Sequence, residues 1–185
     1  MEFRQSGVLH AEEKDYKTSY SYFFEAFEQF SALDDPLAVK ALAYMLLCKI
    51  MTNNTDDVTS IVNTKGGLKH AGAETEAMKA VAKAHINRSL KAFEEALSTY
   101  KEQLGNDPII QTHLKALYST LMEQNLCRLI EPYSRVEVSH LAGLMELPLK
   151  TVENKLSQMI LDKKFAGILD QVRHHLTSPP PPPIV

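Results

Sequence analysis

The sequence predicts a mostly α-helical protein, in which right-handed, tetratricopeptide-like helical hairpins stack into a solenoid and an incomplete helix-turn-helix module follows. Apolar residues recur every three or four positions through most of the 185 residues, which is the spacing of one buried helix face. Tryptophan is absent and there are only 7 glycines, a composition that suits helices better than sheets. A chain of this length can build one sizeable core or a short helical array.

The N-terminal part predicts one helical hairpin. Its second helix carries an aromatic stripe near helical spacing, made of Tyr16, Tyr20, Phe23, Phe24, Phe27 and Phe30. A shorter helix over residues 8–13 precedes it, and the pair resembles a tetratricopeptide hairpin. We therefore assign residues 1–33 to the end of a solenoid. Because a first repeat normally needs a polar cap, we expect further repeats before it.

Residues 34–131 predict further stacked helices. The helix over residues 37–50 carries only Lys40 and Lys49 as charges, so neighbours should cover it on most sides. Gly66 and Gly67 should loosen the chain, and Gly105 should end the helix over residues 90–104 with a left-handed residue. Burying each Leu or Phe contributes roughly 1.5–3 kcal/mol, so packing between hairpins should set stability.

The most informative segment begins at Asp107. Asp107 can accept backbone N–H groups as an N-cap, and Pro108 fits the first helical position. A long amphipathic helix should then continue until Pro132 stops it.

Residues 132–171 predict the front of a winged helix. The short β-branched stretch 135–138 can form an edge strand, and two amphipathic helices follow around the break at Leu147 and Pro148. A second strand should cover residues 165–169.

The segments IEPYSRVEV, KTVENKLSQMILDKKF and GILDQ closely resemble the C-terminal part of PCI-domain proteins, and in particular the PCI subunits of the proteasome lid. The resemblance implies that residues 34–131 are the helical-repeat part and residues 132–171 the winged-helix part of such a domain. It implies a non-catalytic scaffold of the 26S proteasome regulatory particle lid in the cytoplasm and nucleus, which supports ubiquitin-dependent protein degradation and has other lid subunits as partners. A PCI subunit of the COP9 signalosome is the alternative.

The C-terminus departs from the family. PCI proteins of this kind continue into a partner strand, the wing, and a long helix, whereas residues 172–185 read VRHHLTSPPPPPIV. Consecutive prolines favour polyproline II and neither pair in a sheet nor form a helix. We therefore expect the wing and the last helix to be missing and the strand 165–169 to keep an unpaired edge that invites self-association. The tail itself is either a ligand for a proline-binding domain or a non-native end.

The family resemblance implies that partner contacts lie on the strand at Arg135, Val136, Glu137 and Val138, on His140, and on the second strand at Phe165, Ile168 and Leu169. Phe165 and Leu169 can alternatively close the core.

No catalytic, cofactor or metal site is predicted. The 2 cysteines, Cys48 and Cys127, lie in apolar helical runs and should be buried free thiols, which fits a reducing compartment. His174 and His175 could bind metal only opportunistically, and no histidine lies in a zinc motif. The longest apolar stretch, residues 41–51, is too short to cross a bilayer.

Nucleic-acid binding is the rival function, because winged helices can enter the major groove. The module carries the cations Arg128, Arg135, Lys150, Lys155, Lys163 and Lys164. It also carries the anions Glu131, Glu137, Glu146, Glu153, Asp162 and Asp170. This near balance argues against a duplex site, because phosphate neutralisation needs several unopposed cations.

Overall fold

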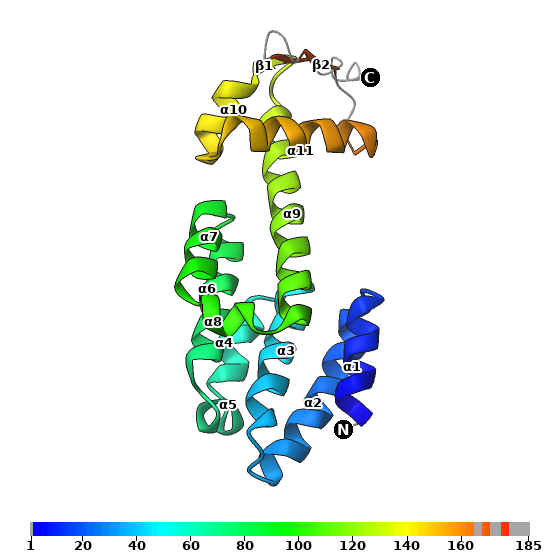
Figure 1. The fold of residues 1–185 in the computed structure, drawn as a ribbon, viewed down its shortest axis with the longest axis vertical. Coiled ribbons are helices and arrows are strands. Elements are labelled where there is room, and N and C mark those ends of the chain that lie inside the picture. The colour runs from blue at the N-terminus through cyan, green and yellow to red at the C-terminus, as the bar shows by residue number, and fades with distance from the viewer. Residues whose placement is uncertain (1, 165–167, 171–174, 178–185) are drawn as a thin grey trace, which may run out of the picture. The chain divides into compact units, whose positions relative to one another are not determined.

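The computed structural model describes residues 2–164, 168–170 and 175–177. Two compact units divide the chain, one at Met1–Tyr118 and the other at Ser119–Val185. The long helix α9, Pro108–Ile130, contributes residues to both units (Figure 1). The structure is predominantly helical, which confirms the predicted fold class of a helical array followed by a winged-helix module.

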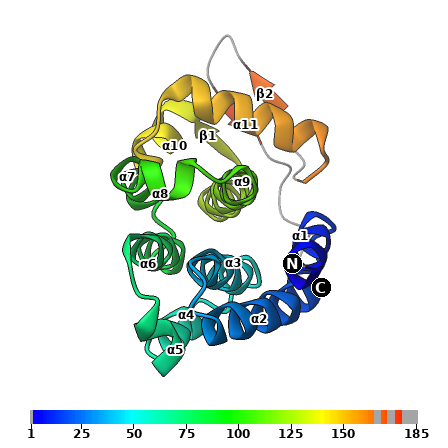
Figure 2. The same cartoon turned by 60° about the horizontal axis from the view of Figure 1, so that its bottom comes forward.

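The first unit is a series of helices. They are α1 Glu2–Glu12, α2 Tyr16–Ala32, α3 Leu37–Met51, α4 Asp56–Val62, α5 Lys65–Lys69, α6 Ala73–Ile86, α7 Leu90–Thr99 and α8 Lys101–Gly105, followed by the first part of α9. Consecutive helices α1, α2 and α3 pack on one another, and α6 packs on both α3 and α7 (Figure 2). The predicted aromatic hairpin is therefore present as α1 and α2.

Helix α3 is the centre of the first unit. Ten of its residues are buried, as its nearly uncharged sequence predicts. The buried Ser19 hydroxyl in α2 contacts both neighbouring helices. It donates to Gly7 O in α1 at 2.7 Å and lies 3.4 Å from Cys48 Sγ in α3. Burial raises the pKa of the Cys48 thiol to about 11. The prediction of a buried free thiol is thus confirmed for Cys48.

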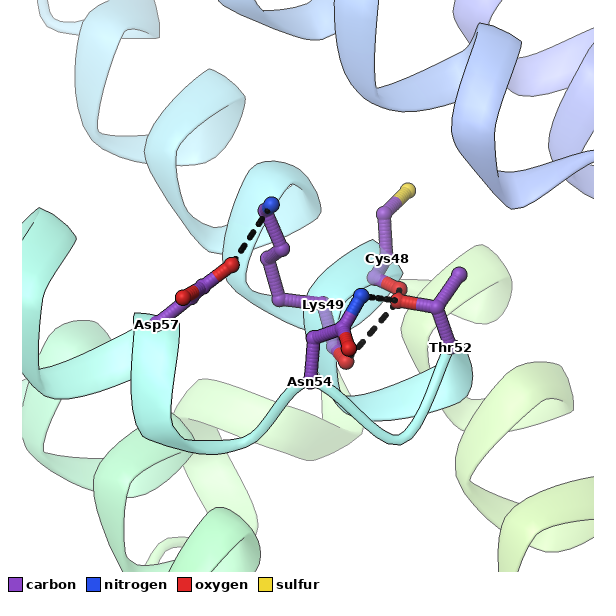
Figure 3. Close-up of polar contacts among 5 residues, drawn as sticks. All are labelled: Cys48, Lys49, Thr52, Asn54 and Asp57. Atoms are coloured by element: carbon purple, nitrogen blue, oxygen red, sulfur yellow. Dashed lines mark hydrogen bonds and ion pairs between the residues drawn. The ribbon is translucent and has the colours of Figure 1, made fainter.

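The turn from α3 to α4 is closed by side chains (Figure 3). Lys49 reaches across it, with Nζ 2.8 Å from Asp57 Oδ2 and 4.5 Å from the centre of the Tyr20 ring. The Thr52 hydroxyl lies 3.0 Å from Cys48 O and accepts a hydrogen bond from Asn54 Nδ2 at 3.3 Å. Lys49, one of the two charged residues of α3, therefore links α3 to α4.

The start of α9 confirms the predicted cap. Asp107 Oδ1 accepts from Ile109 N at 3.0 Å, and its Oδ2 accepts from the Tyr44 hydroxyl at 2.6 Å. Burial and this carboxylate both raise the pKa of Tyr44 above its ordinary value. Asp107 thus caps α9 and attaches it to α3.

Several local predictions are wrong. Gly66 and Gly67 lie within α5 rather than in a loose segment, because Thr64 caps that helix by accepting from Gly67 N at 3.1 Å. None of the glycines in the described part of the chain has a positive φ, so Gly105 is not a left-handed stop. The helix expected over residues 90–104 breaks at Tyr100, whose ψ of 36° leaves the α region.

Cys127 was predicted to be buried, but it is exposed. At this point only the face of α9 that carries Leu126 and Ile130 is buried. Cys127 follows Leu126 by one position, so its side chain points away from that face.

The second unit is a small winged helix. After the end of α9 come β1 Arg135–Glu137, α10 Val138–Met145, α11 Leu149–Leu161, β2 Ile168–Asp170 and β3 His175–Thr177. The strands form one antiparallel sheet in the order β1-β3-β2. Leu176 pairs with Val136 on one side and with Leu169 on the other.

This sheet corrects the prediction of a missing partner strand. The sequence pattern places residues 175–177 in the tail, yet β3 pairs with both β1 and β2, so β2 has a partner. The prolines begin only at Pro179, and His175, Leu176 and Thr177 are free to donate backbone hydrogen bonds. Because β2 is still an edge strand in the order β1-β3-β2, the expected self-association through this strand stays a prediction.

Candidate protein-interaction surface on the winged helix

The sheet of the second unit has one buried face and one exposed face. Val136 and Leu176 are buried and face the helices, together with the partly buried Leu169. Arg135, Thr177 and Ile168 are register partners one position away, so they lie on the opposite face. All three are exposed, and Ile168 exposes 74% of its surface. We call Arg135, Thr177 and Ile168 the outer row.

The predicted contact residues divide between surface and core. Arg135, Glu137, His140 and Ile168 are exposed, and Leu169 is partly buried. Val136 and Val138 are buried, so they can offer a partner backbone atoms only. Phe165 lies outside the described residues.

His140 is exposed at the start of α10, and its ring makes an edge contact with Tyr133, with centroids 6.4 Å apart. This pair extends the exposed surface beyond the strand β1.

Leu176 is the residue that sequence reasoning missed. It is fully buried at 0% exposure and pairs with both flanking strands. The signal was present as a single apolar residue between His175 and Thr177, which is a half-buried strand pattern only two steps long.

A partly buried ion cluster joins α9 to α11 within the second unit. Lys155 Nζ lies 2.7 Å from Glu123 Oε1 and 2.6 Å from the Ser119 hydroxyl. The second carboxylate oxygen of Glu123 accepts a hydrogen bond from Lys164. Partial burial alone would raise the pKa of Glu123, but the hydrogen bonds from Lys155 and Lys164 outweigh it and hold that pKa below its ordinary value. Glu123 is therefore ionised at neutral pH.

Neither a metal site nor a membrane-spanning helix is present in the described segments. No group of three or more His, Cys, Asp or Glu side chains in residues 2–164, 168–170 and 175–177 is arranged to hold a metal ion. Over the same residues, no helix has the length and apolar character needed to span a bilayer.

Comparison with known proteins now identifies the module. Residues 97–179 match the model of the PCI domain. This part of the chain is therefore similar to a PCI domain. This PCI match contains the later part of the helical array and every helix and strand of the winged helix described above.

The relatives of this chain carry a consistent name. It is 68% identical over 167 residues to the 26S proteasome non-ATPase regulatory subunit 11 homolog of Arabidopsis thaliana. It is 61% identical over 168 residues to 26S proteasome non-ATPase regulatory subunit 11 of Dictyostelium discoideum. It is 50% identical over 171 residues to the 26S proteasome regulatory subunit RPN6 of Saccharomyces cerevisiae. Each match covers 90% of this chain.

The predicted resemblance to PCI subunits of the proteasome is thereby confirmed. The chain spans about 40% of the length of these relatives. These relatives are named as regulatory, non-ATPase subunits.

Proposed function

We propose that this chain is a non-catalytic scaffold of the 26S proteasome regulatory particle lid, which acts through PCI-mediated contacts with other lid subunits. By holding those subunits in register it contributes to ubiquitin-dependent protein degradation in the cytoplasm and nucleus. Identity of 68% to a regulatory subunit 11 homolog across nine-tenths of the chain is the observation that carries this proposal.

The winged helix offers a suitable contact surface. Its small sheet has β1 and β2 at the two edges, and edge strands can accept a strand from another chain. Arg135 and Ile168 on the outer row supply one charge and one large exposed apolar side chain beside those edges. Arginine is enriched among the residues that contribute most to the binding energy of protein interfaces.

Co-purification tests the proposal. Tagged wild-type protein, expressed in cells, should recover other lid subunits in stoichiometric amounts. Ile168→Asp should reduce that recovery about tenfold or more, because a charge would replace an interfacial apolar anchor. The variant should remain folded, since the Ile168 side chain points away from the core.

Leu33→Asp is the matched control. Leu33 is exposed to 77% at the end of α2 in the first unit, so the same change of an exposed apolar residue occurs away from the sheet. Recovery should stay at the wild-type level. Wild-type protein that recovers no lid subunit would contradict the proposed function, whereas equal recovery by both variants would contradict the surface.

The structure gives no support to the nucleic-acid alternative. Lys155 was one of the available cations, but it is buried against Glu123, and Lys164 is also paired with that carboxylate. Fewer cations than the sequence offers are therefore free to neutralise phosphate.

A further inference from the structure

Lys155 is an unusual residue in this fold. Its exposure is 8%, and it is the only Lys, Arg, Asp or Glu that is buried within the described residues. A buried ammonium group is costly unless it is fully paired, and well-packed apolar residues of similar size are often equally stable in its place. Stability alone therefore does not explain why α11 carries a charge here.

The ion cluster joins specific pairs of atoms, which an apolar contact would not do. Glu123 projects from α9, and its two oxygens bind two different positions of the following chain. One oxygen holds Lys155 in the middle of α11. The other holds Lys164, which lies after the end of α11 and four positions before β2 begins at Ile168.

The backbone changes direction between Lys155 and Lys164. Helix α11 ends at Leu161, and Lys163 has a positive φ of 54°. The Lys164 N–H donates to Met159 O at 3.0 Å and closes the helix end. The side chain of Lys164 then returns to Glu123, so the exit path of the chain from α11 is fixed both by backbone and by side-chain bonds.

We propose that Glu123 is a positioning residue for the interaction surface: through Lys164 it sets the direction in which the β2–β3 hairpin leaves α11, while through Lys155 it fixes α11 on α9. The proposal rests on the proposed function insofar as the hairpin carries Ile168 and Thr177 of the outer row. Lys164 is half exposed at 48%, so its pair with Glu123 should contribute little to the global free energy of unfolding. The expected effect is local and limited to the hairpin.

Amide hydrogen exchange on the free protein tests the proposal without any partner. In Lys164→Gln, exchange of the β2 and β3 amides should accelerate about fivefold or more, while the amides of α10 and α11 keep their wild-type rates. Glu123→Gln should accelerate the hairpin amides at least as much. Lys163→Gln is the matched control, because Lys163 is the exposed neighbouring lysine and makes no ion pair among the described contacts.

The outcomes separate cleanly. Hairpin exchange at the wild-type rate in Lys164→Gln and Glu123→Gln would overturn the proposal. An equal acceleration throughout α10 and α11 in Lys164→Gln would also overturn it, because the pair would then simply hold the fold.

Recovery of lid subunits supplies the second readout. Lys164→Gln should lower recovery about tenfold, and Lys163→Gln should leave it unchanged. Equal recovery by these two variants would contradict the positioning role in binding. Failure of the wild-type protein to recover any lid subunit would instead contradict the proposed function, and the exchange result would still stand.

Discussion

At the scale of single residues, glycines matter where two backbones approach closely. Gly67 lies in α5, and a Cβ at this position would come within 2.4 Å of Ile61 O and 2.5 Å of Val62 O. Both atoms belong to the backbone, so they cannot move aside as a flexible side chain could. Gly143 in α10 is the opposite case, because a Cβ there would meet nothing within 4 Å.

We expect alanine substitutions at Gly67 and Gly143 to change the free energy of unfolding in opposite directions. Gly67→Ala should lower the free energy of unfolding by about 2 kcal/mol or more, because the α4–α5 corner must open to admit the methyl group. Gly143→Ala should raise it by about 0.5–1 kcal/mol, since alanine is the better helix former. Urea denaturation followed by circular dichroism measures both. A destabilised Gly143→Ala or a neutral Gly67→Ala would contradict the packing described here.

At the scale of secondary-structure elements, six of the described helices are followed by a left-handed residue that is not glycine. The left-handed residues are Lys14, Asp34, Asn53, Arg88, Glu146 and Lys163. Each follows a helix, and each of these helix ends has an equivalent pair of backbone hydrogen bonds. At the end of α1, for example, Asp15 N donates to His10 O and Lys14 N donates to Ala11 O. Placing a residue with a Cβ in this conformation has a cost that glycine avoids.

Replacing Lys14 by glycine should therefore stabilise the first unit. Lys14→Gly is expected to raise the free energy of unfolding by up to about 1 kcal/mol, because the left-handed conformation is then unstrained. The same substitution at the exposed Lys115, in the middle of α9, should lower it by about 1 kcal/mol. Chemical denaturation of the two variants side by side gives the comparison, and the same sign for both would refute it.

The packing of α11 on α9 carries a pH dependence. The pKa of Glu123 is lower in the folded protein than its ordinary value of 4.5. Its ionised form therefore stabilises the fold above that ordinary pKa, and this contribution disappears as the pH falls through the lowered folded value. Both Glu123 and Lys155 are largely shielded from solvent, so the contribution should be appreciable.

Glu123→Gln should accordingly reduce the free energy of unfolding by about 1–3 kcal/mol at pH 7. The difference from wild type should shrink as the pH is lowered below the ordinary pKa of the carboxyl group. Urea midpoints measured in a pH series down to the acid limit of the fold would show this convergence. A difference that stays constant or grows in acid would mean that the carboxylate charge is not responsible.

At the scale of the whole molecule, the charge balance separates protein contacts from nucleic-acid contacts. The chain has 20 Lys and Arg against 23 Asp and Glu, for a formal charge of -3. The winged helix has balanced charges as well, and its ion cluster removes Lys155 and Lys164 from the set of free cations. A long-range attraction to phosphate polymers is therefore not expected.

Binding to a short fluorescent DNA duplex tests this expectation. At about 0.15 M salt, fluorescence anisotropy should detect no complex tighter than about 10⁻⁵ M. A polybasic peptide of similar size on the same duplex provides the positive control. Submicromolar binding that weakens steeply with added salt would favour the nucleic-acid function instead.

Much of this fold follows from local sequence patterns. The apolar periodicities of α2, α3, α9, α10 and α11 predicted their existence, and the cap at Asp107 placed the start of α9. These features depend on residues a few positions apart, where helix geometry alone decides which side chains share a face. The resemblance to PCI proteins likewise rests on contiguous segments.

The tertiary structure decided what distant residues do together. β3 was missed because a strand of three residues has almost no pattern of its own and is stabilised by pairing on both sides with β1 and β2. The contact of Glu123 with Lys155 and Lys164 joins residues 32 and 41 positions apart, and no spacing rule connects them. The sequence by itself thus determined most of the helices and the resemblance to PCI proteins, whereas three-dimensional packing determined the sheet, the exposed outer row and the ion cluster, because each of these requires partners that are separated along the chain.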